Sequence, residues 1–169
     1  SMAARECFSG AYGPSYLEIP RDILDAEVQT TRVVVPKPGS YRSSVKSIGD
    51  PADIEKLADI LVKAKRPAVL LGQQVWSSRG HEDAINFVRA LDIPAYMNGA
   101  SRGMLPQSDP HHFDRTRSDA FKNADVILIV GTPFDFRMGY GNAFPRKQLW
   151  CRLIRVMRQL VRIGISVLG

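Results

Sequence analysis

The sequence predicts an α/β fold in which an open, mostly parallel sheet has helices on both faces. Three short apolar runs, at residues 68–71, 94–97 and 125–130, are separated by segments with helical spacing of apolar side chains. Strands that are apolar along their whole length are typical of parallel sheets, because helices cover both of their faces. Glycine closely follows each run, as is common where a buried strand ends. We therefore expect a central, nucleotide-binding-like domain over residues 50–141.

The first helix of this domain should begin at Asp50-Pro51. Aspartate is a favoured N-cap, proline is tolerated in the first turn, and Asp53 and Glu55 lie near the positive end of the helix. Apolar side chains at helical spacing predict a buried stripe, formed by Ile54, Leu57, Ala58, Leu61 and Val62. Pro67 ends the helix before the first strand.

Two further helices are expected over residues 80–91 and 116–123, before and after the second strand and the loop that follows it. The loop contains the pair His111-His112, but the sequence has no H-E-x-x-H or comparable metal-binding set. We therefore interpret these histidines as part of a solvated loop rather than as metal ligands.

The N-terminal residues have a different character. Residues 13–20 are expected to form a short strand bounded by prolines. Residues 25–49 are rich in Thr, Val, Pro, Ser and Lys, with P-K-P-G at 36–39. Because proline removes a backbone donor and biases its predecessor toward extended geometry, we interpret residues 25–49 as an interdomain linker.

The composition is that of an ordinary globular protein. Hydrophobic residues make up 44% of the chain, and no apolar run approaches the roughly 18 residues of a membrane span. Six of the 23 basic residues lie within residues 142–169, which contain no acidic residue, and the other 17 match the 17 acidic residues. Cys7 and Cys151 lie far apart, which is compatible with a reducing cytoplasm. We therefore expect a cytoplasmic protein with no nucleic-acid or membrane partner.

Ligands of open parallel sheets bind beyond the carboxyl ends of the strands. Those ends correspond here to residues 72–74, 98–103 and 131–137, and each contains a glycine that allows close approach of the backbone. Two of the loops also carry an arginine, whose planar fork matches a phosphate group. We therefore expect a phosphate-bearing ligand at this edge; the alternative is that the glycines only terminate buried strands. The fingerprints G-x-G-x-x-G, G-x-x-x-x-G-K-[ST] and G-x-S-x-G are absent.

The order of these segments resembles the central domain of thiamine diphosphate-dependent enzymes, in the group of acetolactate synthase, oxalyl-CoA decarboxylase and 2-hydroxyacyl-CoA lyase. The matching segments are K-R-P-A-V-L-L-G at 65–72, I-P-A-Y-M-N-G-A-S-R-G-M-L-P at 93–106, D-P-H at 109–111, T-R-S-D-A-F-K-N-A-D-V-I-L-I-V-G at 116–131 and F-D-F-R-M-G-Y-G at 134–141. Residues 13–24 resemble the last strand of the preceding pyrimidine-binding domain. We therefore interpret residues 1–24 as a C-terminal remnant of that domain.

The resemblance implies a parent enzyme that uses thiamine diphosphate and Mg²⁺ as a carboligase, lyase or decarboxylase of 2-keto acids or 2-hydroxyacyl thioesters. Such enzymes form homodimers or homotetramers of chains that also contain pyrimidine- and pyrophosphate-binding domains. The family's activating glutamate and its G-D-G pyrophosphate motif are not among the residues of this sequence. We therefore expect no catalytic residue and no metal site in this chain, and no activity of the chain by itself. A stand-alone NAD- or ADP-binding module is the alternative.

In many members of the family the central domain holds FAD or ADP. Carried over by position, the contacting residues come from three strand-end loops and one arginine: Gly72, Gln73, Gln74, Asn98, Arg117, Gly131, Thr132, Asp135 and Arg137. FAD-binding members have a glycine triplet or G-x-G after the first strand, whereas this sequence has G-Q-Q. Because two glutamine side chains crowd that loop, we expect ADP or an empty site rather than FAD.

Residues 142–169 depart from the family, which continues here with a strand of V-x-I-D character. At face value, Arg152, Arg155, Arg158 and Arg162 lie among apolar residues and predict a basic amphipathic helix. Such a helix would suit a membrane surface or nucleic acid. A frameshift is the second interpretation: in a frame that starts at the third base of each codon, residues 150–154 can encode V-V-Q-I-D.

We favour the frameshift, which predicts that the coding DNA of residues 150–154 spells V-V-Q-I-D in the shifted frame, followed by an acidic turn. The basic tail would then have no selected function, and the sheet would lack its next native strand. Sequencing the coding DNA tests this, and third-position bases that cannot encode V-V-Q-I-D would contradict it.

Overall fold

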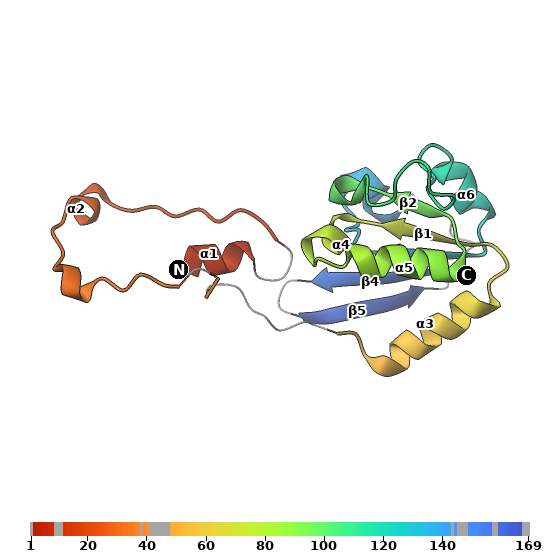
Figure 1. Ribbon diagram of the computed structural model, residues 1–169, viewed down its shortest axis with the longest axis horizontal. Coiled ribbons are helices and arrows are strands. Elements are labelled where there is room, and N and C mark those ends of the chain that lie inside the picture. The colour runs from red at the N-terminus through yellow and green to blue at the C-terminus, as the bar shows by residue number, and fades with distance from the viewer. Residues whose placement is uncertain are drawn as a thin grey trace. The chain divides into compact units, whose positions relative to one another are not determined.

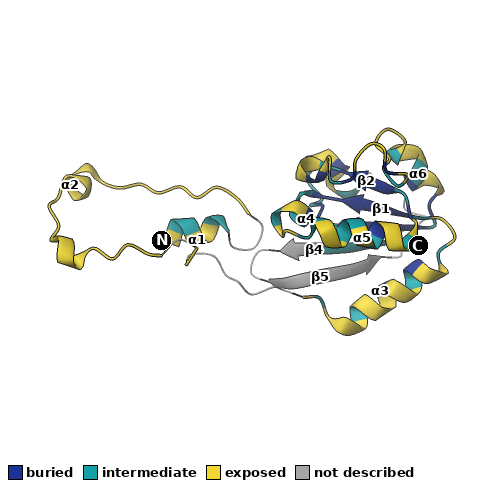
Figure 2. Ribbon diagram, in the orientation of Figure 1, coloured by how far each residue is buried: buried dark blue, intermediate teal, exposed yellow. Residues whose placement is uncertain are grey.

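The computed structural model describes residues 2–8, 12–37, 39–40, 48–142, 144, 149–156 and 159–166. The chain divides into two compact units, Ser1–Lys46 and Ser47–Gly169, which are described separately (Figure 1). The described residues of the first unit form α1 (Met2–Cys7), α2 (Arg21–Leu24) and the 3₁₀ turn η1 (Thr30–Arg32). None of these elements has a buried residue, and most of this unit is exposed in Figure 2.

The strand expected over residues 13–20 is not found, because these residues have no regular secondary structure. A strand exists only when its backbone N–H and C=O groups pair with a neighbouring strand. The described residues of the first unit contain no strand with which residues 13–20 could pair. The segment is extended and ends at Pro20, which directly precedes α2.

The second unit confirms the predicted α/β fold. Its sheet has the strand order β2-β1-β3-β4-β5, in which the first four strands are parallel and β5 is antiparallel to β4. The strands are β1 (Pro67–Leu71), β2 (Ala95–Met97), β3 (Val126–Val130), β4 (Leu149–Val156) and β5 (Gln159–Ser166). The helical elements are α3 (Pro51–Lys63), α4 (Gln73–Ser77), α5 (His81–Leu91), η2 (Gly99–Ser101), α6 (Arg117–Asn123) and η3 (Phe136–Gly141).

Alternate strand residues face the two sides of the sheet, as the two-residue period of a strand requires. One side packs against α3, α4 and α5, and its buried strand residues are Val69, Leu71, Ala95, Met97, Val126, Leu128 and Cys151. The other side packs against α6, and its buried strand residues are Ala68, Leu70, Tyr96, Ile127 and Ile129. The two sides explain why the strands are apolar along their whole length (Figure 2).

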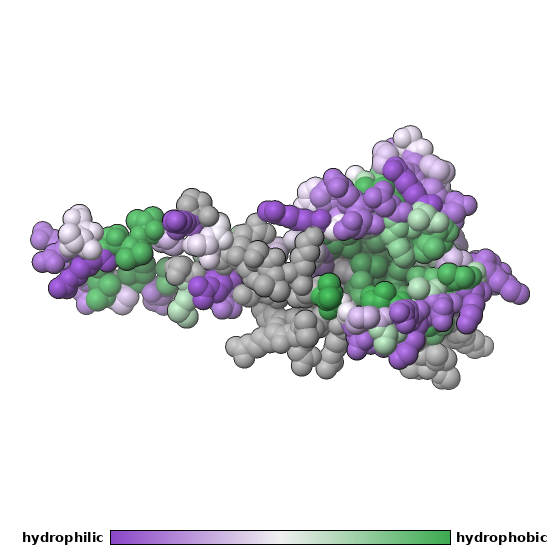
Figure 3. Space-filling view, turned by 60° about the horizontal axis from the view of Figure 1, so that its bottom comes forward, coloured by the Kyte–Doolittle hydropathy of each residue, from purple (hydrophilic) through white to green (hydrophobic). Residues whose placement is uncertain are grey.

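Helix α3 begins as expected, since the Asp50 carboxylate accepts a hydrogen bond from the Ala52 amide at 2.9 Å. The predicted stripe is only partly buried. Leu57 and Leu61 enter the core, whereas Ile54 is 41% exposed and Val62 is 77% exposed. The helix therefore contacts the sheet along a narrower line than its apolar spacing suggests. On the face of the second unit that Figure 3 shows, apolar side chains gather in the middle.

The basic amphipathic helix expected in the tail is wrong, because residues 149–156 and 159–166 form strands. Strand β4 continues the parallel sheet beside β3, with Val126 opposite Leu149 and Val130 opposite Leu153. Cys151 is fully buried there, and burial raises the pKa of its thiol. The outer edge of β3 offers unpaired backbone groups, and a run rich in Leu, Ile and Val suits that position. The sheet therefore does not end after Gly141.

The loop with the two histidines is held to the domain rather than solvated. The Asp109 side chain is 4% exposed, and its carboxylate accepts hydrogen bonds from the Arg89 guanidinium at 2.8 and 3.1 Å. His111 is 14% exposed, and its ring lies 2.8 Å from the Asp109 carboxylate and 2.9 Å from that of Asp92. The main chain also pairs with β2, since the Ala95 amide donates to the His111 carbonyl at 2.8 Å. The expectation of a solvated loop is therefore wrong.

These contacts shift two pKa values in opposite directions. Hydrogen bonds from Arg89, and then from His111, hold the pKa of Asp109 well below its ordinary value of 3.8. The hydrogen bonds to Asp109 and then to Asp92 raise the pKa of His111 above 6.5. The stability that the ionised Asp109 contributes is therefore fully present above pH 3.8 and is lost as the pH falls through the lowered pKa. The His111 contribution is complete below pH 6.5 and is lost as the pH rises through the raised pKa.

We predict that His111→Gln lowers stability more at pH 6 than at pH 9, because only the protonated imidazole forms ion pairs with Asp92 and Asp109. Denaturant unfolding of the wild type and the variant across this pH range measures the difference in free energy. A difference that stays constant or grows above pH 7 would contradict the role assigned to the protonated ring.

Candidate functional site

The carboxyl ends of β1, β2 and β3 meet at one edge of the sheet, where the sequence predicts the ligand site. Each strand is followed by backbone that turns at or beside a glycine: Gly72, Gly99 and Gly131. Gly99 has a φ of +55° and Gly131 a φ of +65°, values that glycine adopts without the steric cost of a Cβ atom. The predicted convergence of the three strand ends is therefore found in the structure.

The G-Q-Q segment is not an open loop. Gln73 and Gln74 form the first turn of α4, with Gly72 as its N-cap. The Gln74 amide donates to the Gly131 carbonyl at 3.0 Å, and the Gly72 amide donates to the Val130 carbonyl at 2.7 Å. These hydrogen bonds hold the start of α4 against the end of β3. The expectation that G-Q-Q is a loop is therefore wrong, because the two glutamines begin a helix.

Two of the glycines make room for this contact between chain segments. A Cβ atom on Gly72 would lie 2.6 Å from the Gly131 carbonyl carbon. A Cβ atom on Gly131 would lie 2.9 Å from the Val75 nitrogen and 3.0 Å from Gln74 Cβ. The 2.6 and 2.9 Å distances are shorter than Cβ contacts in real proteins, so a larger residue at either position requires a shift of its neighbours. Packing within the chain thus accounts for both glycines.

A small recess lies beside this contact. Its walls come from all three strand ends: Gln73, Asn98, Thr132, Pro133, Asp135, Arg137 and Met138. Five of these seven are among the nine residues predicted to contact a nucleotide. The recess has a volume of about 10 Å³, which is about what one water molecule needs. It can admit an oxygen atom of a ligand but not a whole nucleotide.

Thr132 provides an unpaired polar group at the recess. The residue is 1% exposed, and its hydroxyl Oγ1 has no hydrogen-bond partner among the described atoms. A buried hydroxyl without a partner costs about 1–3 kcal/mol relative to a satisfied one. No described residue therefore compensates for the water that the Thr132 hydroxyl loses on burial.

Arg137 is already paired with a neighbouring carboxylate. Two guanidinium nitrogens donate to one oxygen of Asp135, with Nε 3.0 Å and Nη2 2.5 Å from Oδ2, and Nε also lies 3.3 Å from Oδ1. The hydrogen bonds from Arg137 lower the pKa of Asp135, and those to Asp135 raise the pKa of Arg137. The Asp135 carboxylate also accepts the Arg137 amide at 3.0 Å, which caps η3. A phosphate group would have to compete with Asp135 for this guanidinium.

The other predicted residues divide into two sets. Gly72, Gln74 and Gly131 lie in the contact beneath the recess, as the hydrogen bond between Gln74 and Gly131 shows. Arg117 is the first residue of α6 and does not line the recess. The structure thus does not bring Arg117 together with the five lining residues.

Comparison with known proteins identifies the fold that carries this recess. The profile of the family described as "Thiamine pyrophosphate enzyme, central domain" matches residues 54–167, about two thirds of the chain. The chain belongs to this family. The match includes β4 and β5, so the tail strands lie within the region that the family profile covers.

Curated relatives of this central domain include two kinds of enzyme. "Probable acetolactate synthase" of Mycobacterium bovis is 40% identical over 91 residues, which cover 54% of this chain and 17% of that protein. "2-hydroxyacyl-CoA lyase 2" of Homo sapiens is 30% identical over 172 residues, which cover 83% of this chain and 27% of that protein. The chain therefore spans between about a sixth and just over a quarter of the length of these relatives.

A solved structure agrees with the fold. A putative thiamin diphosphate-dependent enzyme from Mycobacterium smegmatis superposes with a TM-score of 0.58 and 18% identity, covering 88% of this chain and 29% of that one. No described helix of the central-domain chain has both the length and the apolar character that a membrane crossing needs. Within the described part of the chain, no group of three or more His, Cys, Asp or Glu side chains is placed to hold a metal ion.

Two residues that line the recess, Met138 and Pro133, were not among the predicted contacts, and neither was Ser101, which contacts Gly72 but does not line the recess. Met138 lines the recess where the chain turns through Gly139 and Tyr140, which both have positive φ. The sulfur of Met138 accepts a hydrogen bond from the side-chain amide of Asn98 at 3.6 Å. Ser101 is fully buried and its hydroxyl donates to the Gly72 carbonyl at 2.5 Å. Pro133 follows Thr132 directly. Ser101 could have been selected from its place in the second strand-end loop, whereas Met138 carries no such signal.

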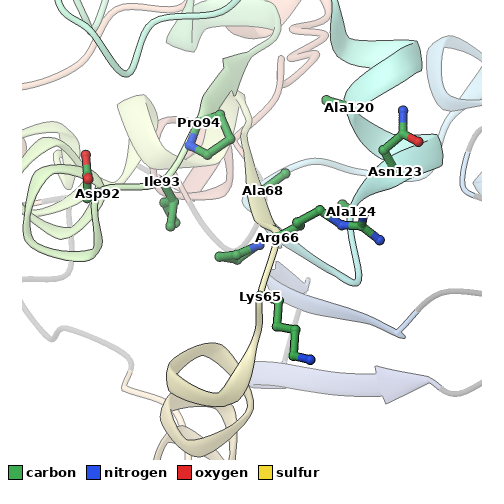
Figure 4. A pocket seen from close by; sticks show the side chains of 10 residues that line it. Lys65, Arg66, Ala68, Asp92, Ile93, Pro94, Ala120, Asn123 and Ala124 are labelled. Carbon is green, nitrogen blue, oxygen red and sulfur yellow. The ribbon is translucent and has the colours of Figure 1, made fainter.

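A larger cavity of about 360 Å³ lies at the opposite, amino edge of the sheet (Figure 4). Its floor is mostly apolar, with Ala68, Ile93, Pro94 and Ala124, and Lys65 and Arg66 lie beside it. The Asp125 carboxylate fixes this corner by accepting the Lys65 and Arg66 amides at 2.6 and 3.0 Å. Because ligands of open α/β sheets bind beyond the carboxyl ends of strands, we place the functional site at the smaller recess.

We predict that Gly72→Ala lowers the free energy of unfolding by about 1–3 kcal/mol, because the new Cβ overlaps the Gly131 carbonyl and the Thr132 hydroxyl. Denaturant unfolding followed by circular dichroism measures this change. Gly13→Ala is the control, since a Cβ there meets no atom within 4 Å. Equal stability of the two variants would contradict the close contact between the ends of β1 and β3.

Proposed function

We propose that this chain acts as the central domain of a longer thiamine diphosphate- and Mg²⁺-dependent enzyme. The family match and the names of its relatives, acetolactate synthase and 2-hydroxyacyl-CoA lyase, support this proposal. The chain spans only 17–27% of those two proteins, which agrees with a role as one domain among several. The reaction would be carboligation, lysis or decarboxylation of 2-keto acids or 2-hydroxyacyl thioesters in the cytoplasm.

Thiamine diphosphate would supply the carbanion chemistry, acting as an electron sink for the reacting carbonyl carbon. The described residues include no group of three or more acidic, histidine or cysteine side chains placed to hold Mg²⁺. We propose, as the resemblance to the family implies, that the thiamine diphosphate and Mg²⁺ sites lie in the pyrimidine- and pyrophosphate-binding domains of the longer enzyme. In a homodimer or homotetramer the central domain would contribute scaffold and subunit contacts.

The central domain itself is proposed to bind the phosphate end of an ADP-type nucleotide at the recess. The observation that carries this proposal is the convergence of Gln73, Asn98, Thr132, Asp135 and Arg137 from three strand ends. The unpaired Thr132 hydroxyl is a ready partner for a phosphate oxygen. Arg137 would turn from Asp135 toward the phosphate, exchanging one two-pronged partner for another.

The same geometry disfavours FAD. Gln73 lines the recess, and its side chain lies near the Gly99 turn, where a Cβ atom would be 3.3 Å from Gln73 Cβ. A recess of about 10 Å³ encloses neither a flavin ring nor an adenine ring, so the crowding by Gln73, and not the volume, supports ADP over FAD. A stand-alone NAD-binding module stays as the alternative. The membrane or nucleic-acid role of a basic helix loses its basis, because the tail forms strands.

Thr132→Val should weaken ADP binding about tenfold or more and raise the free energy of unfolding by about 1 kcal/mol, because it removes an unpaired buried hydroxyl that a phosphate would satisfy. Titration calorimetry with ADP, FAD and NAD, together with denaturant unfolding, measures both effects.

Thr116→Val is the matched control, because the Thr116 hydroxyl lies 3.3 Å from the Tyr96 hydroxyl and outside the recess. It should leave ADP affinity unchanged. Tight NAD binding with no response to ADP would support the NAD-binding module instead. Wild-type protein that binds neither nucleotide would leave only the scaffold role.

A further inference from the structure

Two large apolar side chains are exposed beside the recess. Phe136 is 74% exposed and Tyr140 is 75% exposed, and both belong to η3. Exposed aromatic rings lose the stabilisation that burial provides, and they are enriched at binding surfaces. Phe136 differs from Tyr140 in its sequence neighbours, because Asp135 and Arg137 on either side of it both line the recess.

The ring of Phe136 lies close to the guanidinium that a phosphate would contact. The carbon at the centre of that guanidinium, Cζ of Arg137, is 5.8 Å from the centroid of the Phe136 ring. A cation over an aromatic ring at this distance is held by the ring's quadrupole. Since 74% of Phe136 stays exposed, most of its ring surface is open to a second planar group.

The size of the recess decides where the rest of a nucleotide must lie. About 10 Å³ holds one oxygen atom, so the ribose and the base of a bound nucleotide lie outside the recess. A base outside an enclosed pocket gains affinity mainly by stacking on an aromatic face. Phe136 presents such a face next to two of the recess residues.

We propose that Phe136 is the stacking platform for the purine base of the nucleotide whose phosphate binds at Thr132 and Arg137. This inference rests on the proposed nucleotide site and specifies its ligand as a purine nucleoside diphosphate held by its two ends. Stacking of a base on an aromatic side chain strengthens binding about 5- to 100-fold, and it tolerates different bases because each has a π face. The site therefore binds ADP more tightly than pyrophosphate and selects weakly between adenine and guanine.

The test compares ADP and inorganic pyrophosphate on the full chain by titration calorimetry. Phe136→Leu keeps an apolar side chain but removes the aromatic face, so it should weaken ADP binding about 5- to 100-fold. It should change pyrophosphate affinity by less than about twofold, because pyrophosphate has no base to stack. Phe136→Trp should restore ADP affinity to the wild-type value or above.

Tyr140→Leu is the matched control, because it removes an equally exposed ring from the same element. It should leave both affinities unchanged. Equal ADP affinities of wild type and Phe136→Leu would overturn the stacking role while leaving the phosphate site intact. Equal losses in the Phe136 and Tyr140 variants would overturn it as well, and wild-type protein that binds neither ligand would overturn both the stacking role and the proposed site.

Discussion

The contact between the carboxyl ends of β1 and β3 determines the geometry of the functional edge. Gly72 lies against the Gly131 carbonyl and the Thr132 hydroxyl, and Gly131 lies against the start of α4, so neither glycine has room for a Cβ atom. Because the strands approach so closely, α4 can begin at Gln73 and donate the Gln74 amide to the Gly131 carbonyl. The recess lies at this contact: Thr132 is buried there, Gln73 and Asn98 line the recess with it, and η3 starts four residues beyond Thr132.

The site is chemically incomplete within the described residues. Thr132 has a buried hydroxyl with no partner, while Arg137 is paired with a carboxylate only two residues away. An anion at the opening would correct the first deficiency and would replace the Asp135 carboxylate in the second. The small volume of the recess means that only the end of a ligand enters it, so any specificity for the rest of the ligand depends on the surface around η3.

The tail shows how weakly a sheet edge discriminates between sequences. The backbone groups of β3 require a parallel neighbour, and residues 149–153 supply one with Cys151 buried opposite Leu128. Hydrogen bonds of this kind involve only the main chain, and several apolar sequences can satisfy them. The frameshift stays a prediction, which the coding DNA tests. What the structure does exclude is a free basic helix over residues 149–156.

The sequence by itself determined the alternation of helices and strands, the start of α3 at Asp50, and the sheet edge at which the three glycine-containing strand ends meet. These features depend on local periodicity, capping and glycine positions, which one segment contains completely. Only the tertiary structure decided that G-Q-Q begins a helix, that the tail pairs with β3, and that His111 is held by Asp109 and Asp92. It also decided that Arg117 lies apart from the recess and that Arg137 is paired. Each of these depends on groups brought together by folding, and the spacing of residues along the chain carries no record of such contacts.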